Sequence, residues 1–223
     1  MEFISLFDII GPNMIGPSSS HTAGACSIAY LAQSLFKGEI KKVEFTLYGS
    51  FAKTYKGHGT DKALVAGILG YKPDDKHIRT SFEEASSRGI EYSFFTNTID
   101  KPDHPNTVDI LIVSKDDKHF FIKGESIGGG KVQITNIDGI DVLFTGEYKT
   151  LIIKQYDKQG VLFKISSILS KYKVNIATVK LYRKEKNKEA FTILENDDSV
   201  PAEAIKELEA LEEVTEVIFL GKE

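Results

Sequence analysis

Two stretches of the N-terminal half repeat apolar residues at the spacing of an α-helix. The first covers residues 28–36 and the second residues 63–69, with Thr60 or Asp61 as the N-cap of the second. Both stretches gather their apolar residues on one face, which is typical of a helix that covers a sheet. Residues 83–87 predict a further short helix. The helices of this half are therefore expected to be few and amphipathic.

Alternation of apolar and polar residues predicts the strands of the same half. The predicted strands are residues 43–48, 92–95, 108–114, 120–123, 132–134 and 142–144. Lys115 to Lys118 and Asp138-Gly139 are typical of turns between antiparallel strands, and three glycines at 128–130 break the pattern. The fold class is therefore α+β, with two helices covering one face of a mostly antiparallel sheet.

The C-terminal half alternates between strand and helix in a regular order. The predicted strands are residues 148–155, 176–183, 190–195 and 214–220, and the predicted helices are residues 160–173 and 201–211. This order is that of a ferredoxin-like βαββαβ domain. The chain is therefore expected to divide near Gly146 into domains of residues 1–146 and 147–223.

Composition and charge exclude several classes of protein. The chain has 223 residues, 41% of them hydrophobic, and a formal net charge of -4, which argues against general binding of nucleic acid. It contains no apolar run long enough to span a membrane. Met1-Glu2-Phe3 does not begin a secretory signal, so a cytoplasmic location is expected.

A single cysteine limits the cofactor chemistry of this chain. Cys26 alone can form neither an internal disulfide nor an iron–sulfur site, so no metal ligand is predicted here. Its position near the start of a helix favours a lowered thiol pKa and reactivity, whereas its small apolar side chain suits a helical core. The core position is the role we expect.

The most distinctive segment is Gly16-Pro17-Ser18-Ser19-Ser20-His21-Thr22, which is predicted to be a loop before the first helix. One hydroxyl is enough to cap a helix, so four hydroxyls beside an imidazole indicate a site for a small polar ligand. His21 is the candidate catalytic base, and Ser18, Ser19, Ser20 and Thr22 are the candidate binding residues.

Three other loops contain residues that suit the same site. His58 lies between glycines just before the second helix, where free backbone N–H groups attract a carboxylate. Asn106 precedes a strand, and Gly128 and Gly129 follow one. Each also has an ordinary structural explanation, namely a hydrogen-bonded loop histidine, a turn asparagine and a flexible or bulged turn. We expect His77 and His119, in charged surroundings, to take no part.

The C-terminal half resembles an ACT domain. The resemblance rests on its element order, on Asp157 to Leu162 at the first strand-to-helix turn, and on Asn175 at the later turn. It implies a dimerisation module or an amino-acid sensor whose effector contacts are Asp157, Gly160, Val161, Leu162 and Asn175. From the residues alone, Asp157 is equally well explained as a cap of the helix, and Gly160 as a turn residue.

The whole chain resembles the β subunits of the bacterial iron–sulfur-dependent L-serine dehydratases. The segments that carry the resemblance are Ile15 to Thr22, Gly57 to Lys62, His104 to Thr107 and Ser126 to Gly130, followed by the ACT-like tail. The resemblance implies an N-terminal domain similar to the allosteric substrate-binding domain of some D-3-phosphoglycerate dehydrogenases. It also implies conversion of L-serine to pyruvate and ammonia, with a four-iron four-sulfur (4Fe-4S) cluster held by three cysteines of a separate α subunit.

The resemblance also implies roles for the candidate residues. His21 would be the base or a proton relay, Ser18, Ser19, Ser20 and Thr22 would hold the serine carboxylate or its water, and His58, Asn106, Gly128 and Gly129 would complete the substrate site. The partners expected are the α subunit, L-serine and a second copy of this chain, paired through either domain, and the isolated chain would be inactive. The alternative is a regulatory protein that binds amino acids or anions without catalysis.

Overall fold

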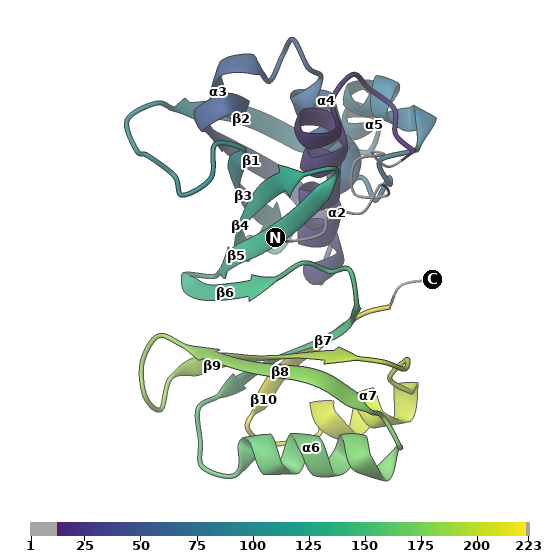
Figure 1. Cartoon of the computed structure of the whole chain (residues 1–223), viewed down its shortest axis with the longest axis vertical. Helices are drawn as coiled ribbons and strands as arrows, with labels where there is room; N and C mark the ends of the chain where they lie inside the picture. The colour runs from purple at the N-terminus through teal and green to yellow at the C-terminus, as the bar shows by residue number, and fades with distance from the viewer. Residues whose placement is uncertain (1–12, 222–223) are drawn as a thin grey trace, which may run out of the picture. The chain divides into compact units, whose positions relative to one another are not determined.

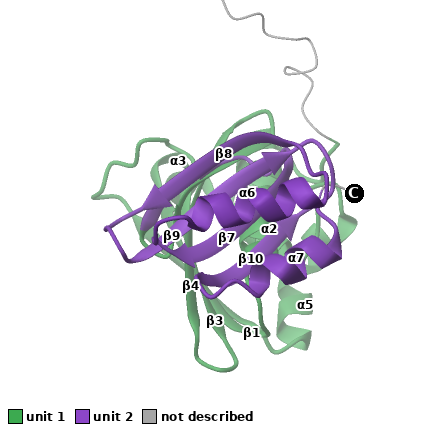
Figure 2. Cartoon of the chain, turned by 90° about the horizontal axis from the view of Figure 1, so that it is seen from below, with its two compact units in different colours: residues 1–139 green, residues 140–223 purple. Residues whose placement is uncertain are grey.

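The computed structural model describes residues 13–221 in two compact units, residues 1–139 and 140–223 (Figures 1 and 2). Met1 to Phe3, considered above for a secretory signal, lie outside the described residues. The division between the units falls before strand β6 (Ile140–Phe144), whereas we predicted it near Gly146. Strand β6 belongs to the second unit, within which the Leu143 carbonyl accepts hydrogen bonds from Lys180 and Tyr182.

The N-terminal sheet has six strands in the order β2-β1-β3-β4-β5-β6. Besides β6, these strands are β1 (Ile40–Tyr48), β2 (Glu91–Asn97), β3 (Thr107–Ser114), β4 (His119–Gly128) and β5 (Lys131–Ile137). β1 pairs with β2 in parallel, whereas β1–β3, β3–β4 and β4–β5 are antiparallel. Val43, Phe45 and Leu47 of β1 are fully buried, as their alternation predicts. The α+β class with a mostly antiparallel sheet is confirmed.

Helical segments pack on this sheet and on one another (Figure 1). They are the π-helical turn η1 (Ser19–Gly24), α2 (Ala25–Leu35), α3 (Gly49–Thr54), α4 (Thr60–Ile68), the 3-10 turn η2 (Lys76–Thr80) and α5 (Ser81–Ser87). α2 packs against β4 and β5, and α4 packs against α2. The two predicted amphipathic helices are therefore adjacent, one of them directly on the sheet.

Two local predictions for this half are wrong, and one short helix was not predicted. Residues 19–22 are not a loop but the first turn of a helix that continues into α2, because Ser18 is extended and caps the turn. The N-cap of α4 is Gly59, with φ +68°, rather than Thr60 or Asp61. The short helix α3 was not predicted, since six residues carry too little apolar periodicity to be recognised.

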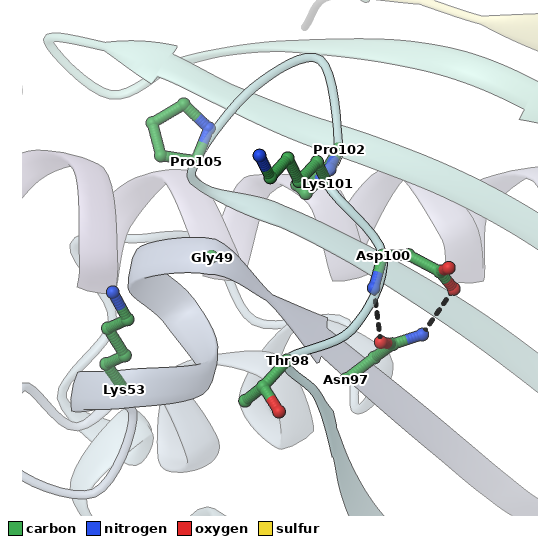
Figure 3. Close-up of a pocket in the computed structure, with 8 residues that line it drawn as sticks. All are labelled: Gly49, Lys53, Asn97, Thr98, Asp100, Lys101, Pro102 and Pro105. Atoms are coloured by element: carbon green, nitrogen blue, oxygen red, sulfur yellow. Dashed lines mark hydrogen bonds between the residues drawn. The ribbon is translucent and has the colours of Figure 1, made fainter.

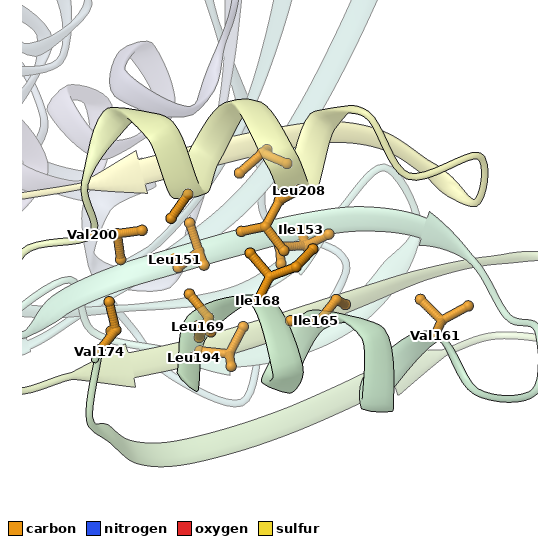
Figure 4. Close-up of a cluster of buried hydrophobic side chains, with 12 residues drawn as sticks. Leu151, Ile153, Val161, Ile165, Ile168, Leu169, Val174, Leu194, Val200 and Leu208 are labelled. Atoms are coloured by element: carbon orange, nitrogen blue, oxygen red, sulfur yellow. The ribbon is translucent and has the colours of Figure 1, made fainter. Parts of the chain in front are cut away.

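The C-terminal unit has the predicted βαββαβ order. Its elements are β7 (Lys149–Tyr156), α6 (Val161–Lys171), β8 (Ile176–Arg183), β9 (Glu189–Asn196), α7 (Ala202–Glu209) and β10 (Val214–Leu220). The strands form an antiparallel sheet in the order β10-β7-β9-β8. Ile165 and Leu169 of α6 and Leu208 of α7 are buried with Leu151, Ile153 and Leu194 in one cluster (Figure 4). Each such side chain stabilises the unit by about 1.5–3 kcal/mol.

The helices of residues 13–221 are short. None of them has both the length and the apolar character that spanning a bilayer requires.

Candidate functional site

Hydroxyl groups lie beside both ring nitrogens of His21. Its Nε2 lies 2.9 Å from Ser50 Oγ, and its Nδ1 lies 3.1 Å from Ser20 Oγ and 3.4 Å from Ser18 Oγ. A hydroxyl donates to a neutral ring nitrogen and accepts from a protonated one. Both charge states of His21 therefore find partners without rearrangement of the backbone.

The turn η1 places His21 by local hydrogen bonds. Ser18 Oγ accepts from the His21 N–H at 3.1 Å, and the Ser18 carbonyl accepts from the Thr22 N–H at 2.9 Å. The Thr22 hydroxyl donates to the His58 carbonyl at 2.9 Å and is almost fully buried. The Thr22 proton is therefore committed to joining two segments, whereas Ser19 has no side-chain hydrogen bond within the described part of the chain and is available to a ligand.

His58 lies beside His21, as the sequence suggested. The two ring centroids are 5.0 Å apart at an interplanar angle of 36°, and His58 Nδ1 lies 3.3 Å from the Thr54 carbonyl. Burial lowers the pKa of His21, and the neighbouring His58 lowers it further. His21 is therefore neutral, and able to accept a proton, at a lower pH than a free histidine.

Asn106 is held by a residue that sequence reasoning did not select, Ser126 of β4. The Ser126 N–H donates to the Asn106 carbonyl at 3.0 Å, and the Asn106 side-chain amide lies 3.4 Å from the Ser126 carbonyl. A Cβ at Gly24, the last residue of η1, would lie 2.0 Å from Ser126 Oγ, so this pair lies against the end of η1. The Asn106 Oδ1 and Ser126 Oγ atoms are buried without a partner within residues 13–221. Both atoms therefore have unused hydrogen-bonding capacity.

The structure explains Gly128 and Gly129 by backbone geometry. Gly128 ends β4 and Gly129 begins the turn to β5, with φ values of +104° and +60°, which glycine adopts readily. No atom lies within 4 Å of where a Gly128 Cβ would be, so no close approach to this position requires a glycine. No hydrogen bond of the described residues joins this turn to His21.

Ser50 is the second site residue that the sequence did not reveal. It belongs to α3, and its N–H donates to the Pro105 carbonyl at 2.6 Å, which joins α3 to the His104–Thr107 segment. A cavity of about 370 Å³ lies beside this contact (Figure 3). It is lined by Gly49, Lys53, Asn97, Thr98, Asp100, Lys101, Pro102 and Pro105. The only sequence signal for Ser50 was the glycine before it.

His77 and His119, the two histidines that we predicted to take no part in the site, lie apart from the cluster around His21. His77 stacks on Tyr71 with ring centroids 4.9 Å apart, and its Nδ1 lies 2.6 Å from Asp75 Oδ1. His119 is exposed at the start of β4. Neither shares a hydrogen-bond partner with His21 within residues 13–221.

Comparison with known proteins assigns the N-terminal part of the chain to a family. Residues 4–136 match the family model "Serine dehydratase beta chain". The chain belongs to this serine dehydratase beta chain family. It is 44% identical to the L-serine dehydratase beta chain of Peptoniphilus asaccharolyticus over 92% of each chain. It is also 38% identical to the probable L-serine dehydratase beta chain of Bacillus subtilis, over 97% of this chain and 98% of that protein.

The chain is also similar to part of a D-3-phosphoglycerate dehydrogenase. The chain is 32% identical to D-3-phosphoglycerate dehydrogenase of Methanocaldococcus jannaschii, over 86% of this chain and 36% of that protein. This similarity supports the expected likeness of this beta chain to the regulatory region of those dehydrogenases.

Residues 149–213 match the ACT domain, so the predicted second domain is confirmed in kind. Asp157 accepts hydrogen bonds from Arg183 Nη1 at 2.6 Å and from the Asn187 N–H at 3.2 Å. The Arg183 contact lowers the Asp157 pKa, and the Asn187 N–H lowers it further. Asp157 therefore ties the β8–β9 turn and does not cap α6, whose N-cap is Gly160 with φ +86°.

Within a single chain, the remaining predicted effector residues do not form one cluster. The Val161 side chain is 1% exposed and belongs to the apolar core of the unit, whereas Leu162 is 41% exposed. Asn175 donates to the Asp197 carboxylate and lines an open cavity of about 440 Å³. It follows the end of α6, whereas Gly160 precedes its start, and α6 is about 16 Å long.

Cys26 has the core role that we expected. It is fully buried, its Sγ donates to the Tyr71 carbonyl at 3.3 Å, and burial raises its pKa to about 12. Within residues 13–221 no three His, Cys, Asp or Glu side chains form a metal-binding group. The described donor set of this beta chain therefore does not fit an iron–sulfur cluster.

Proposed function

We propose that this chain is the β subunit of a two-chain L-serine dehydratase that converts L-serine to pyruvate and ammonia. The names and extent of its beta chain relatives support this assignment. The observation that carries it is the His21 site, where a neutral imidazole lies among serine hydroxyls and beside a second imidazole. We expect the enzyme to be cytoplasmic.

In the proposed reaction, His21 accepts the α proton of L-serine at a ring nitrogen. The electron pair of the Cα–H bond forms the Cα=Cβ bond while hydroxide leaves Cβ, and the resulting aminoacrylate tautomerises and hydrolyses to pyruvate and ammonia. The Ser18, Ser19 and Ser20 hydroxyls bind the substrate carboxylate or its water. His58 and Asn106 complete the polar wall, and Gly128 and Gly129 shape the neighbouring turn.

The α subunit remains part of the proposal, with the 4Fe-4S cluster that the resemblance assigns to its cysteines. Such a cluster would supply Lewis-acid chemistry, and the described residues of this chain would not hold it. Since the described residues of this chain lack a suitable donor set, the chain alone should be inactive.

The test is anaerobic co-expression with the candidate α subunit, followed by measurement of pyruvate release from L-serine. We expect His21→Asn to lower kcat by at least about 100-fold, the usual contribution of a general base. His77→Asn, a histidine of the same chain outside the cluster, is the matched control and should retain activity. A turnover number unchanged by His21→Asn would exclude His21 as the base.

A regulatory role is the second candidate, favoured by the similarity to a dehydrogenase over 86% of this chain. In this case the ACT domain would bind an amino acid through Asp157, Gly160, Leu162 and Asn175 of two paired copies. Calorimetry of the isolated chain with L-serine separates the alternatives. Tight binding together with full activity of His21→Asn would favour regulation over catalysis.

A further inference from the structure

The imidazole of His21 contacts one hydroxyl that comes from a separate element, Ser50 of α3. We propose that Ser50 is a positioning residue, which holds the His21 ring through Nε2 and serves as the partner of that nitrogen in both charge states. The kinetic consequence rests on the proposed function of His21, whereas the effect on the His21 ring does not.

The distances support this role of Ser50. The Ser50 Oγ–His21 Nε2 distance of 2.9 Å is the shortest of the three hydroxyl contacts of the ring. Ser18 and Ser20 belong to the same turn as His21 and follow it wherever the turn moves. Ser50 is 29 positions away in sequence, so its contact relates the ring to the rest of the N-terminal unit.

Helix α3 is itself held in place. The Ser50 N–H donates to the Pro105 carbonyl at 2.6 Å, which joins α3 to another segment, whereas the bond from the Thr54 hydroxyl to the Ser50 carbonyl stays within the helix. Gly49 has φ +52°, and a Cβ there would lie 2.5 Å from the Pro105 oxygen. The backbone that carries Ser50 is thus tied to the segment that contains Asn106, which leaves the Ser50 hydroxyl little positional freedom.

The same helix also holds the second imidazole. The Thr54 carbonyl can only accept a hydrogen bond, so His58 Nδ1, 3.3 Å away, carries the proton. Ser50 near one end of α3 and Thr54 at the other therefore contact the two rings whose centroids lie 5.0 Å apart. The Ser50 hydroxyl can rotate, so it can donate to an unprotonated Nε2 and accept from Nε2–H.

The first test uses the full chain with 15N-labelled histidine and needs no partner subunit. The variants are Ser50→Ala, Ser50→Thr, which keeps the hydroxyl, and the matched control Thr54→Val, which removes a hydroxyl from the same helix. We expect Ser50→Ala to shift the Nε2 resonance and tautomer ratio of His21 toward those of an imidazole without this hydrogen bond. Ser50→Thr and Thr54→Val should stay close to the wild type.

An unchanged His21 resonance in Ser50→Ala, or an equal change in Thr54→Val, overturns the positioning role. If Ser50→Ala does not fold, Ser50→Cys replaces it, because a thiol is similar in size and a weaker hydrogen-bond donor.

The second test uses the assembled enzyme and pyruvate release. We expect Ser50→Ala to lower kcat about tenfold with little change in KM, as for one lost hydrogen bond at a reacting group, and Ser50→Thr to restore most of the rate. A His21 resonance that moves while kcat stays at the wild-type value supports the positioning role and contradicts His21 as the base. The two proposals therefore fail separately.

Discussion

Gly67 lies in α4 where that helix meets α2, and its replacement by alanine should destabilise the N-terminal unit. A Cβ at Gly67 would lie 2.4 Å from the carbonyl oxygen of Cys26 and 2.7 Å from both the Ala29 Cβ and the Tyr30 N. Two of these three are backbone atoms of α2. They can move away only if one helix moves relative to the other.

The expected magnitude combines two opposing effects. Alanine is the better helix former by about 0.8–1 kcal/mol, which by itself would stabilise α4. Overpacking a tightly packed interior costs about 1–3 kcal/mol, and contacts with backbone favour the upper end of this range. The net expectation is a loss of about 2 kcal/mol in the free energy of unfolding of the N-terminal unit.

The assay is a urea titration followed by the amide resonances of each unit. Because the chain has two compact units, a single averaged signal would not report one transition. Resonances of α2 and α4 report the N-terminal unit, and those of α6 and α7 report the C-terminal unit as an internal reference. Gly57→Ala is the matched control, because the nearest atom to its Cβ position is 3.7 Å away.

A different result would refute the packing argument. If Gly67→Ala unfolds at the same urea concentration as the wild type, or at a higher one, the helix contact at Gly67 does not limit side-chain size. If Gly57→Ala destabilises the N-terminal unit equally, the lost free energy of unfolding comes from replacing a glycine in general and not from the helix contact.

Two further predictions concern titratable groups. Because the folded His21 pKa is lowered, the unfolded chain binds more protons between that value and about 6.5, so stability should fall as the pH drops through this window. Urea midpoints at pH 7.5 and 5.5 should show a smaller pH effect in His21→Asn, and equal effects would contradict the assignment. Cys26, with its pKa raised to about 12, should react with iodoacetamide slowly at pH 8 in the folded chain and rapidly in denaturant, whereas equal rates would contradict its burial.

Local sequence patterns were sufficient for most of the fold. Each element of the ACT domain carries its own apolar period, so the order of strands and helices followed without tertiary information. The serine-rich segment was recognisable because its composition exceeds what a helix cap needs. Its conformation was not, since a π-helical turn depends on the Ser18 cap and on the helix that follows.

The sequence by itself determined the chemistry of the site, because one short segment places a histidine among serine hydroxyls. Only the tertiary structure decided which residues meet it, because Ser50 lies 29 positions from His21 and belongs to a helix too short to predict. It also decided the sign of the effect at Gly67, where helix propensity favours alanine and the neighbouring backbone excludes it. Propensity and composition act through neighbours in the chain, whereas hydrogen bonds and close packing act between residues that only folding brings together.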